Sequence, residues 1–332
     1  MKNEHIFKDI RNIVILRTDR IGEVLLSTPV IEALKRKFPK ARISFVTSYY
    51  ARDIVAGRSD LSEVITFDTI AKKLSLWKAF ELAGKLKRHS FDMAIVLNPH
   101  KVLHLGVFLA GIKYRVGFDR KWGFLLNVKT QDKRDEAKMH EVKYDLKLLS
   151  LIGVHEEDIS PFMLVLSKSS YYVKGLLEQT GIKGERKIVA IHPGSSNFAK
   201  KLPADKFKEV VRGLIETDNI EVVLVGSKDE KALCNDIKSS FGNQVHDLAG
   251  LFSLRELAAI LKVSDLFITN DNGPMHIAAA VGTKVLALFN KDAVGSNPAR
   301  WAPYGDGHSV IYKSFNDITP DEVIQVAKKI LL

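Results

Sequence analysis

The sequence predicts an α/β protein made of two doubly wound, Rossmann-like domains that face a central cleft. Short apolar runs alternate with longer amphipathic stretches, as expected of parallel strands joined by helices. The alternation stops between residues 153 and 170, where the chain is acidic and then extended, and it restarts afterwards. A length of 332 residues is enough for two domains. The predicted domains are residues 1–167 and 168–332.

The first domain is predicted from buried strands that alternate with helices. β-branched and aliphatic residues form each apolar run, with polar turns on either side. The predicted strands are Ile13–Leu16, Ile43–Thr47, Val64–Phe67 and Met93–Leu97. The predicted helices are 22–38, 51–56 and 76–88. The apolar segment Val102–Ala110 is interpreted as a core helix, with a membrane-touching face as the alternative.

The second domain repeats this pattern. A helix is predicted at Tyr171–Thr180, ahead of the first strand of the new series. The predicted strands are Ile188–His192, Val222–Val225, Leu266–Thr269 and Val285–Phe289. The predicted helices are Ala204–Thr217, Glu230–Ser239 and the small-residue helix from Pro274 to Gly282. Ligands of such sheets bind beyond the carboxyl ends of the strands, which directs attention to the loops there.

Composition excludes several classes of protein. A single cysteine, Cys234, rules out a disulfide framework and a cysteine-based zinc site. The charged amino terminus is unlike a signal peptide, and the longest apolar run, Val102–Ile112, is too short to span a bilayer. We therefore expect a cytoplasmic protein.

The net charge of +11 is concentrated in the first half of the chain. Residues 1–167 contain 29 Lys and Arg against 20 Asp and Glu, whereas residues 168–332 contain 21 against 19. Such an excess favours an anionic partner, either nucleic acid or a phosphorylated lipid at a membrane surface. The alternative is a solvated basic face without a partner.

The turn Thr269-Asn270-Asp271-Asn272-Gly273 is the most informative local feature. It joins a buried strand to a helix that begins at Pro274, a favoured position for proline. Its free N–H groups, at Asn272, Gly273 and Met275, and the positive helix end suit a phosphate. We expect Asp271 to accept hydrogen bonds from sugar hydroxyls and His276 to donate to a phosphate oxygen. The alternative is an ordinary capped turn.

Two further loops of the second domain supply polar groups. Gly194, Ser195 and Ser196 present amides and hydroxyls, and Lys200 could neutralise a diphosphate leaving group. Glu230 follows a strand, where a carboxylate often binds a ribose diol. A simple acid in the first turn of a helix is the alternative for Glu230.

In the first domain, the loop after the first strand contains Arg17, Asp19, Arg20 and Glu23. Glu23 lies in the first helical turn and is a candidate general base toward a hydroxyl. The helix end and the nearby arginines are expected to lower its pKa, unless a closed cleft desolvates it. A structural ion-pair acid is the alternative.

Several catalytic motifs are absent from the sequence. There is no P-loop, no nucleophile elbow and no cluster of metal ligands, and "HEVKY" lacks the second histidine of a zincin. No nucleic-acid-binding motif is present, which argues against a nucleic-acid partner.

Five segments, in this order, resemble glycosyltransferase family 9, the ADP-heptose:lipopolysaccharide heptosyltransferases. They are "RTDRIGEVLLSTPVIEALKRKFP", "AGIKYRVGFD", "HPGSSNFAKKLPADKF", "LAGLFSLRELAAILKVSDLFITNDNGPMHIAAAVGTKVLALF" and "NPARWAPYG". The resemblance covers nearly the whole chain. It implies a GT-B fold, with acceptor binding in the first domain and nucleotide-sugar binding in the second. It also implies an inverting single displacement without an essential metal or another cofactor.

The resemblance also implies roles for individual residues. The general base falls on Glu23, where the family usually has aspartate, and Asp19 is the second candidate for that role. The phosphate-contacting lysine falls on Lys200 and the nucleoside-binding acid on Glu230. The sugar- and phosphate-contacting motif falls on Asp271, Asn272, Gly273 and His276.

The resemblance predicts transfer of heptose from ADP-heptose to Kdo-lipid A or heptosyl-Kdo-lipid A at the inner-membrane surface. Basic and polar residues of the first domain are the candidates for binding this phosphorylated glycolipid. They are Arg20, Asn98, His100, Lys113, Arg115 and Arg120. One alternative is a family 9 enzyme with another sugar or acceptor glycan. The other is a non-catalytic nucleotide-sugar-binding protein, to which the glutamate in place of aspartate gives some support.

Overall fold

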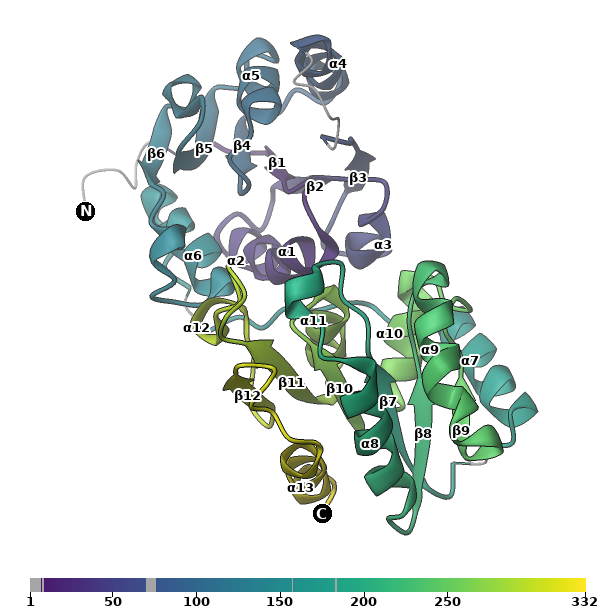
Figure 1. Cartoon of the computed structure of the whole chain (residues 1–332). Helices are drawn as coiled ribbons and strands as arrows, with labels where there is room; N and C mark the ends of the chain where they lie inside the picture. Colours follow the sequence, from purple (N-terminus) through teal and green to yellow (C-terminus); the bar gives the residue numbers. More distant parts are fainter. Residues whose placement is uncertain (1–6, 8, 70–75, 157, 183) are drawn as a thin grey trace. The chain divides into compact units, whose positions relative to one another are not determined.

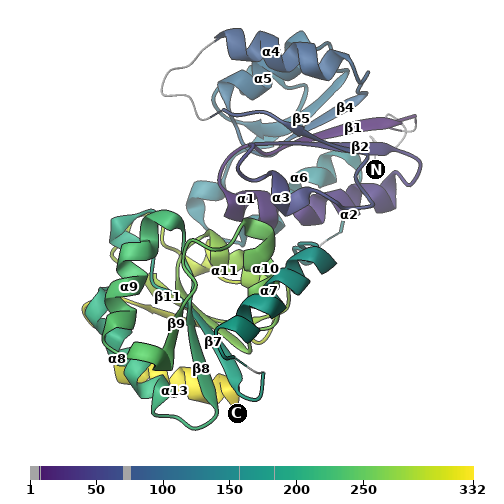
Figure 2. The ribbon, with the colours of Figure 1, turned by 90° about the vertical axis from the view of Figure 1, so that its right-hand side faces the viewer.

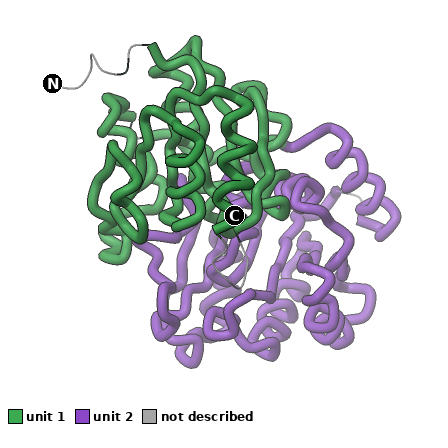
Figure 3. The backbone as a smooth tube through the Cα atoms, turned by 90° about the horizontal axis from the view of Figure 1, so that it is seen from above, with its two compact units in different colours: residues 1–164 green, residues 165–332 purple. Residues whose placement is uncertain are grey.

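The computed structural model describes residues 7, 9–69, 76–156, 158–182 and 184–332. Most of the charged amino-terminal segment lies outside these residues, as does Glu157 of the acidic segment. The chain divides into two compact units, Met1–Leu164 and Val165–Leu332 (Figure 3). Within the described parts, no helix combines the length and the apolar character needed to cross a bilayer.

The first unit is built on a sheet of six parallel strands in the order β3-β2-β1-β4-β5-β6 (Figure 1). Its strands are β1 (Asn12–Leu16), β2 (Arg42–Thr47), β3 (Glu63–Thr66), β4 (Met93–Val96), β5 (Tyr114–Asp119) and β6 (Val128–Gln131). Ile13 pairs with Ile43 of β2 on one side and with Met93 of β4 on the other. The central strands are buried along almost their whole length, because both faces of the sheet are covered.

Helices cover both faces of this sheet. Figure 2 shows α4 and α5 on one face and α1, α2, α3 and α6 on the other. The helices are α1 (Ile21–Leu26), α2 (Thr28–Lys37), α3 (Arg52–Val55), α4 (Leu76–Lys87), α5 (Lys101–Leu109) and α6 (Glu141–Leu148). Val102, Leu103 and Val107 of α5 are buried in the core, which supports the interpretation of this apolar segment as a core helix.

The second unit also has six parallel strands, in the order β12-β11-β10-β7-β8-β9. Its strands are β7 (Lys187–His192), β8 (Ile220–Leu224), β9 (Val245–Asp247), β10 (Leu266–Asn270), β11 (Lys284–Asn290) and β12 (Ser309–Lys313). Its helices are α7 (Ser167–Gln179), α8 (Ala204–Ile215), α9 (Lys231–Ser239), α10 (Leu254–Lys262), α11 (Gly273–Ala280), α12 (Pro298–Trp301) and α13 (Pro320–Leu331). Gly282, with φ of +90°, follows α11 and allows the chain to turn into β11.

The structure corrects the predicted elements in two ways. The single helix expected over 22–38 is two helices, α1 and α2, which meet at Ser27. The strands β5, β6, β9 and β12 and the helices α6, α10, α12 and α13 were not predicted. β6 and β12 are edge strands with partly exposed residues, and β9 has three residues, so none of the three carries the continuous apolar run of a central strand.

Each sheet reverses its strand order at one point. β1 lies between β2 and β4, and β7 lies between β8 and β10. At such a switch point the loops after the two neighbouring strands separate and leave room for a ligand. The predicted loops after β1 and β4, and those after β7 and β10, lie at these two points.

Candidate functional site

The turn before α11 is fixed by its own asparagine. Asn272 is the N-cap of α11, and its Oδ1 accepts a hydrogen bond of 3.2 Å from the N–H of Met275. The amide of Met275, which the sequence suggested as a phosphate donor, is thus occupied by the cap. Among the described residues, the N–H groups of Asn272 and Gly273 have no acceptor, so they remain available to an anion.

The neighbouring strand end holds the loop after β7 in place. Asn270 is buried, and its amide nitrogen donates to the carbonyls of Pro193 (3.0 Å) and Gly194 (3.2 Å). Its Oδ1 accepts from the N–H of Leu202 at 3.1 Å. Asn270 therefore clamps both ends of the loop that carries Ser195, Ser196 and Lys200.

Lys200 lies beside the turn, and its ammonium group is paired with other residues of the protein. Its Nζ is 2.5 Å from Asp271 Oδ2 and 3.0 Å from the carbonyl of Gly295. The sequence assigned Asp271 to sugar hydroxyls alone, whereas the structure also makes it the counter-ion of Lys200. A diphosphate that binds here competes with Asp271 for the ammonium group.

Glu230 is the last residue of the 3₁₀ turn η5 (Lys228–Glu230). Only one of its two carboxylate oxygens, Oε2, accepts hydrogen bonds from the described residues. Its Oε2 accepts from the N–H and the hydroxyl of Ser227, both at 2.8 Å, and lies 3.0 Å from Nε2 of His192. Burial acts to raise the pKa of Glu230, but the hydrogen bonds from His192 and Ser227 outweigh it and hold the pKa at about 2. Glu230 is therefore ionised at neutral pH.

The second oxygen of Glu230 faces Gly194. A Cβ at position 194 would lie 1.8 Å from Oε1, so only glycine fits beside this carboxylate. Among the described residues, Oε1 accepts no hydrogen bond, which leaves it available to a hydroxyl. The other predicted donor-binding residues are placed as follows. His276 is buried near the start of α11. Ser195 Oγ accepts a hydrogen bond from the N–H of Asn197, and Ser196 is exposed.

In the first unit, Glu23 is a buried residue of α1 with 7% of its surface exposed. Its Oε1 accepts from Nε of Arg20 at 2.8 Å. Burial and the nearby Asp19 raise the pKa of Glu23, against the opposing effect of Arg20 and Arg17. Desolvation, which the sequence left open as the exception to a lowered pKa, is the largest effect here, and burial within the first unit supplies it. A raised pKa makes Glu23 a better proton acceptor than an ordinary surface glutamate.

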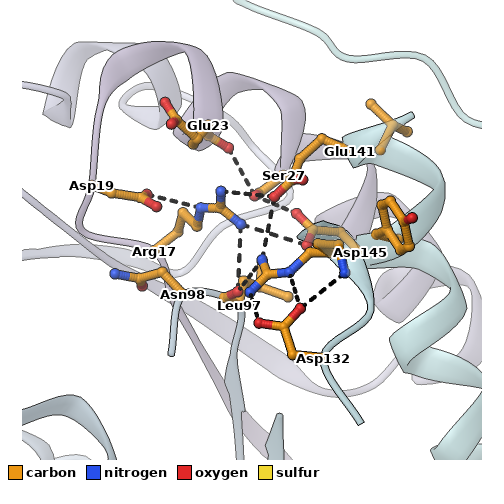
Figure 4. A network of polar contacts seen from close by, with 12 residues as sticks. Arg17, Asp19, Glu23, Ser27, Leu97, Asn98, Asp132, Glu141 and Asp145 are labelled. Atoms are coloured by element: carbon orange, nitrogen blue, oxygen red, sulfur yellow. Dashed lines mark hydrogen bonds and ion pairs between the residues drawn. The ribbon is translucent and has the colours of Figure 1, made fainter. Parts of the chain in front are cut away.

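A buried ionic network lies beneath this loop (Figure 4). Arg17 donates from Nε to Asp19 (2.8 Å) and from Nη2 to Glu141 (3.1 Å), and its Nη1 lies 3.5 Å from Asp145. The side chains of Arg17, Glu141 and Asp145 are at most 2% exposed. Arg17 thus joins the loop after β1 to α6, and it holds Asp19 beside Glu23.

A second arginine completes the network. Arg134 binds both oxygens of Asp132 at 2.9 Å and donates to Glu141 at 3.3 Å. Its guanidinium lies 4.1 Å from the ring centre of Phe118, and it shares the carbonyl of Leu97 with Arg17. The HExx pattern rejected as a zincin has a structural role here, because it places Glu141 in this network.

Asp145 contacts the junction of α1 and α2 through Ser27. Ser27 Oγ lies 2.9 Å from the carbonyl of Glu23 and donates to Asp145 Oδ2 at 2.6 Å. Burial is the largest effect on Asp145 and, with Glu141, raises its pKa to about 7, against the effect of Arg17. Ser27 in turn fixes the junction of α1 and α2.

We therefore expect Asp145→Asn to become increasingly stabilising, relative to wild type, as the pH rises. Asp145 has a pKa of about 7 in the folded protein, above its ordinary value. The folded state keeps a proton that the unfolded chain has lost, so wild-type stability falls between about pH 4 and pH 7, by up to about 4 kcal/mol. Urea denaturation of both proteins at pH 4.5, 6 and 8 checks this. A pH-independent difference would contradict it.

The predicted acceptor residues divide between two edges of the first sheet. Asn98 follows β4, and its amide exchanges 3.3 Å hydrogen bonds with Thr18 across the switch point. His100 caps α5, and burial and Lys121 lower its pKa. Arg120 follows β5 and pairs with Asp135 at 3.0 Å. These residues lie at the edge of the sheet where the strands end, as do Arg20 and Glu23.

The structure does not bring Lys113 and Arg115 to that edge. Both lie at the start of β5, and parallel strands start together at the opposite edge of the sheet. Arg115 donates to the carbonyls of Leu125 (2.8 Å) and Ile112 (2.7 Å), which gives it a structural role in fixing the chain between β5 and β6. They therefore lie apart from Arg20 and Glu23, and their role in acceptor binding stays a prediction.

Sequence reasoning missed His192, Asn270, Glu141 and Asp145. His192 and Asn270 are polar residues that end buried strands, and this signal could have identified them. Glu141 and Asp145 lie more than 110 residues from their partners Arg17 and Ser27, so no local pattern reveals their pairing.

The sequence model of glycosyltransferase family 9 (heptosyltransferase) matches residues 79–329. Lipopolysaccharide heptosyltransferase 2 of Escherichia coli is 23% identical, with 96% of this chain and 98% of that protein aligned. Lipooligosaccharide heptosyltransferase 2 of Haemophilus influenzae is 25% identical, with 96% and 99% aligned.

Solved structures of similar fold cover nearly the whole chain. A family 9 glycosyltransferase from Veillonella parvula has a TM-score of 0.88 at 20% identity, with 97% of each chain covered. ADP-heptose lipopolysaccharide heptosyltransferase II of E. coli has a TM-score of 0.79 at 23% identity, with 97% and 98% covered. At these identities the likeness establishes the fold, which is GT-B. The family match spans most of the chain, and the protein is thus a glycosyltransferase that belongs to family 9, the heptosyltransferase family.

Proposed function

We propose that this enzyme transfers heptose from ADP-heptose to the inner core of lipopolysaccharide, with Kdo-lipid A or heptosyl-Kdo-lipid A as acceptor. The observation that carries the proposal is the group of Asn272 and Lys200 at the switch point between β7 and β10, with Glu230 beside it at the end of the next strand, β8. It combines free amides at a helix N-terminus, a lysine and an ionised carboxylate. These groups suit the diphosphate and the ribose of a nucleotide-sugar.

In the proposed reaction Glu23 takes the proton of an acceptor hydroxyl. The hydroxyl oxygen attacks the anomeric carbon from the face opposite the diphosphate, and the bond from that carbon to the diphosphate oxygen breaks. The leaving ADP keeps the electron pair, and its charge is stabilised by Lys200 and the amides of Asn272 and Gly273. The sugar configuration inverts, and no step calls for a metal. Transfer should therefore persist in EDTA.

The assignment of roles to the two units follows from the same residues. The second unit contains the donor-binding groups, and the first contains Glu23 and the basic excess. A phosphorylated glycolipid at the inner-membrane surface is the anionic partner that this charge favours, rather than nucleic acid. We propose that the protein is cytoplasmic and binds that surface peripherally.

The proposal is tested by release of ADP from ADP-heptose, with and without Kdo-lipid A. Acceptor-dependent release is the expected result. Release with another acceptor or sugar nucleotide alone would support a family 9 enzyme of different specificity, which the glutamate at position 23 favours. Binding of ADP-heptose without turnover on any acceptor would support the non-catalytic alternative.

Lys200→Met is expected to lower kcat by about 10²–10³-fold, the usual loss when one group that stabilises developing charge is removed. The matched control is Lys201→Met, which removes a lysine from the adjacent position and should change kcat little. Steady-state kinetics with saturating acceptor measure both. Equal losses in the two variants would mean that general positive charge, rather than the position of Lys200, is responsible.

A further inference from the structure

His192 connects two parts of the donor site that are far apart in the sequence. It is the last residue of β7, and 5% of its surface is exposed. Its Nδ1 lies 2.9 Å from the amide nitrogen of Asn272, and its Nε2 lies 3.0 Å from Glu230 Oε2. One buried ring therefore contacts both the cap of α11 and the carboxylate after β8.

The hydrogen bonds around Asn272 determine the orientation of its amide and the tautomer of His192. Asn272 Oδ1 accepts from the backbone N–H of Met275, which can only donate, so the other amide atom is the nitrogen. That nitrogen also lies 2.9 Å from Thr269 Oγ1. It donates to Nδ1 of His192, which leaves the ring proton on Nε2. Nε2 then donates to Glu230.

This arrangement fixes Glu230 from two sides. Ser227 and His192 occupy Oε2, and Oε1 is directed toward Gly194. A ribose hydroxyl bound by Oε1 would therefore lie at a set position relative to Asn272 and Gly273, whose amides face the diphosphate in the proposed function. The carbonyl of Gly194 also accepts from the Asn272 amide at 3.2 Å, and Glu230 Oε1 lies beside this glycine. His192 differs from Gly194 because its ring hydrogen-bonds to Glu230 as well as to Asn272.

We infer that His192 is a positioning residue that holds the ribose-binding carboxylate of Glu230 at a fixed separation from the diphosphate-binding turn at Asn272. The inference rests on the proposed function, because it requires a ribonucleoside diphosphate in this site. It follows that Nε2, through Glu230, positions the ribose, whereas Nδ1, through Asn272, positions the diphosphate.

The test uses two variants that each keep one half of the ring's contacts. The amide nitrogen of glutamine in His192→Gln can replace Nε2 and donate to Glu230. The amide oxygen of asparagine in His192→Asn can replace Nδ1 and accept from Asn272. Calorimetry on the full chain measures binding of ADP and of 2′,3′-dideoxy-ADP, which lacks the ribose hydroxyls. Thermal melting confirms that each variant is folded, and Glu230→Gln provides a third variant.

Wild type should bind ADP at least about tenfold more tightly than the dideoxy analogue, since a hydrogen bond to a charged group is worth at least that much. His192→Gln should keep this preference while weakening both nucleotides by about three- to tenfold, the size of coupling expected within one network. His192→Asn should bind the dideoxy analogue like wild type and lose most of the preference, as should Glu230→Gln.

Other outcomes overturn the inference. Equal weakening of both nucleotides in both His192 variants would indicate a purely structural residue. A wild-type protein that binds ADP without preference over the dideoxy analogue would remove the ribose role of Glu230 and leave the proposed function intact. A wild-type protein that binds neither nucleotide would overturn the proposed function together with the inference.

Discussion

Glu23→Gln is expected to lower kcat for sugar transfer by about 10²–10⁴-fold, the usual contribution of a general base. Affinity for the donor should be unchanged, because the donor-binding groups lie in the second unit. The amide oxygen of glutamine can still accept from Arg20, so the fold of α1 is kept. Because burial and Asp19 raise the pKa of Glu23, the acid limb of the wild-type pH profile should lie above the ordinary range of a glutamate. Rapid-quench kinetics across pH measure both effects.

Two further variants identify the base. Glu23→Asp keeps a carboxylate but moves it by roughly an ångström, which should cost up to about a hundredfold in rate while the pH dependence persists. Asp19→Asn tests the second candidate, whose carboxylate is paired with Arg17. Should Asp19→Asn abolish transfer and Glu23→Gln spare it, the base is Asp19.

Arg17→Met is expected to destabilise the first unit by about 3–5 kcal/mol, as happens when one partner of a buried ion pair is removed. The change takes one of two arginines from the fully buried Glu141 and removes the guanidinium beside Asp145. Urea denaturation in a Trp301→Phe background measures the effect. In that background the remaining tryptophans, Trp77 and Trp122, both report on the first unit.

Arg36→Met is the matched control for Arg17→Met. Arg36 also pairs with two carboxylates, those of Glu32 and Glu156, but its side chain is 51% exposed. Solvent screens such pairs, so the expected loss is much smaller than for Arg17→Met. Similar losses in the two variants would mean that burial of the network adds nothing to stability.

The central strands were predictable from the sequence because they are buried on both faces and read as continuous apolar runs. Ile13–Leu16 and Val285–Phe289 are examples. Edge strands such as β6 lack that signal. The break at Ser27 has a local signal that the predicted single helix overlooked, because Pro29, the second residue of α2, has no N–H to donate to a helix that runs on from α1. The contact of Ser27 with Asp145, 118 residues away, could not be predicted.

The candidate site was predictable where strand ends and helix starts define it. Asn272 and Lys200 lie in the loops at the switch point of the second sheet, and Glu230 follows the adjacent strand β8, as their positions after strands implied. What the sequence did not reveal is the pairing among them. Lys200 with Asp271, and Glu230 with His192, are contacts between loops that only the strand order brings together. Whether burial or the arginines dominate the pKa of Glu23 could not be predicted for a similar reason, because burial depends on packing.

Both sheets have the same strand order, and in each an asparagine spans the switch point: Asn98 to Thr18 in one, Asn272 to His192 in the other. The two halves of the enzyme are thus variations on one pattern, each with a separate core and a separate set of loops. Under the proposed function, donor choice and acceptor choice rest on different loops and can change independently. Chimaeras that exchange the loops after β1 and β4 between family members should then change the acceptor and keep the donor.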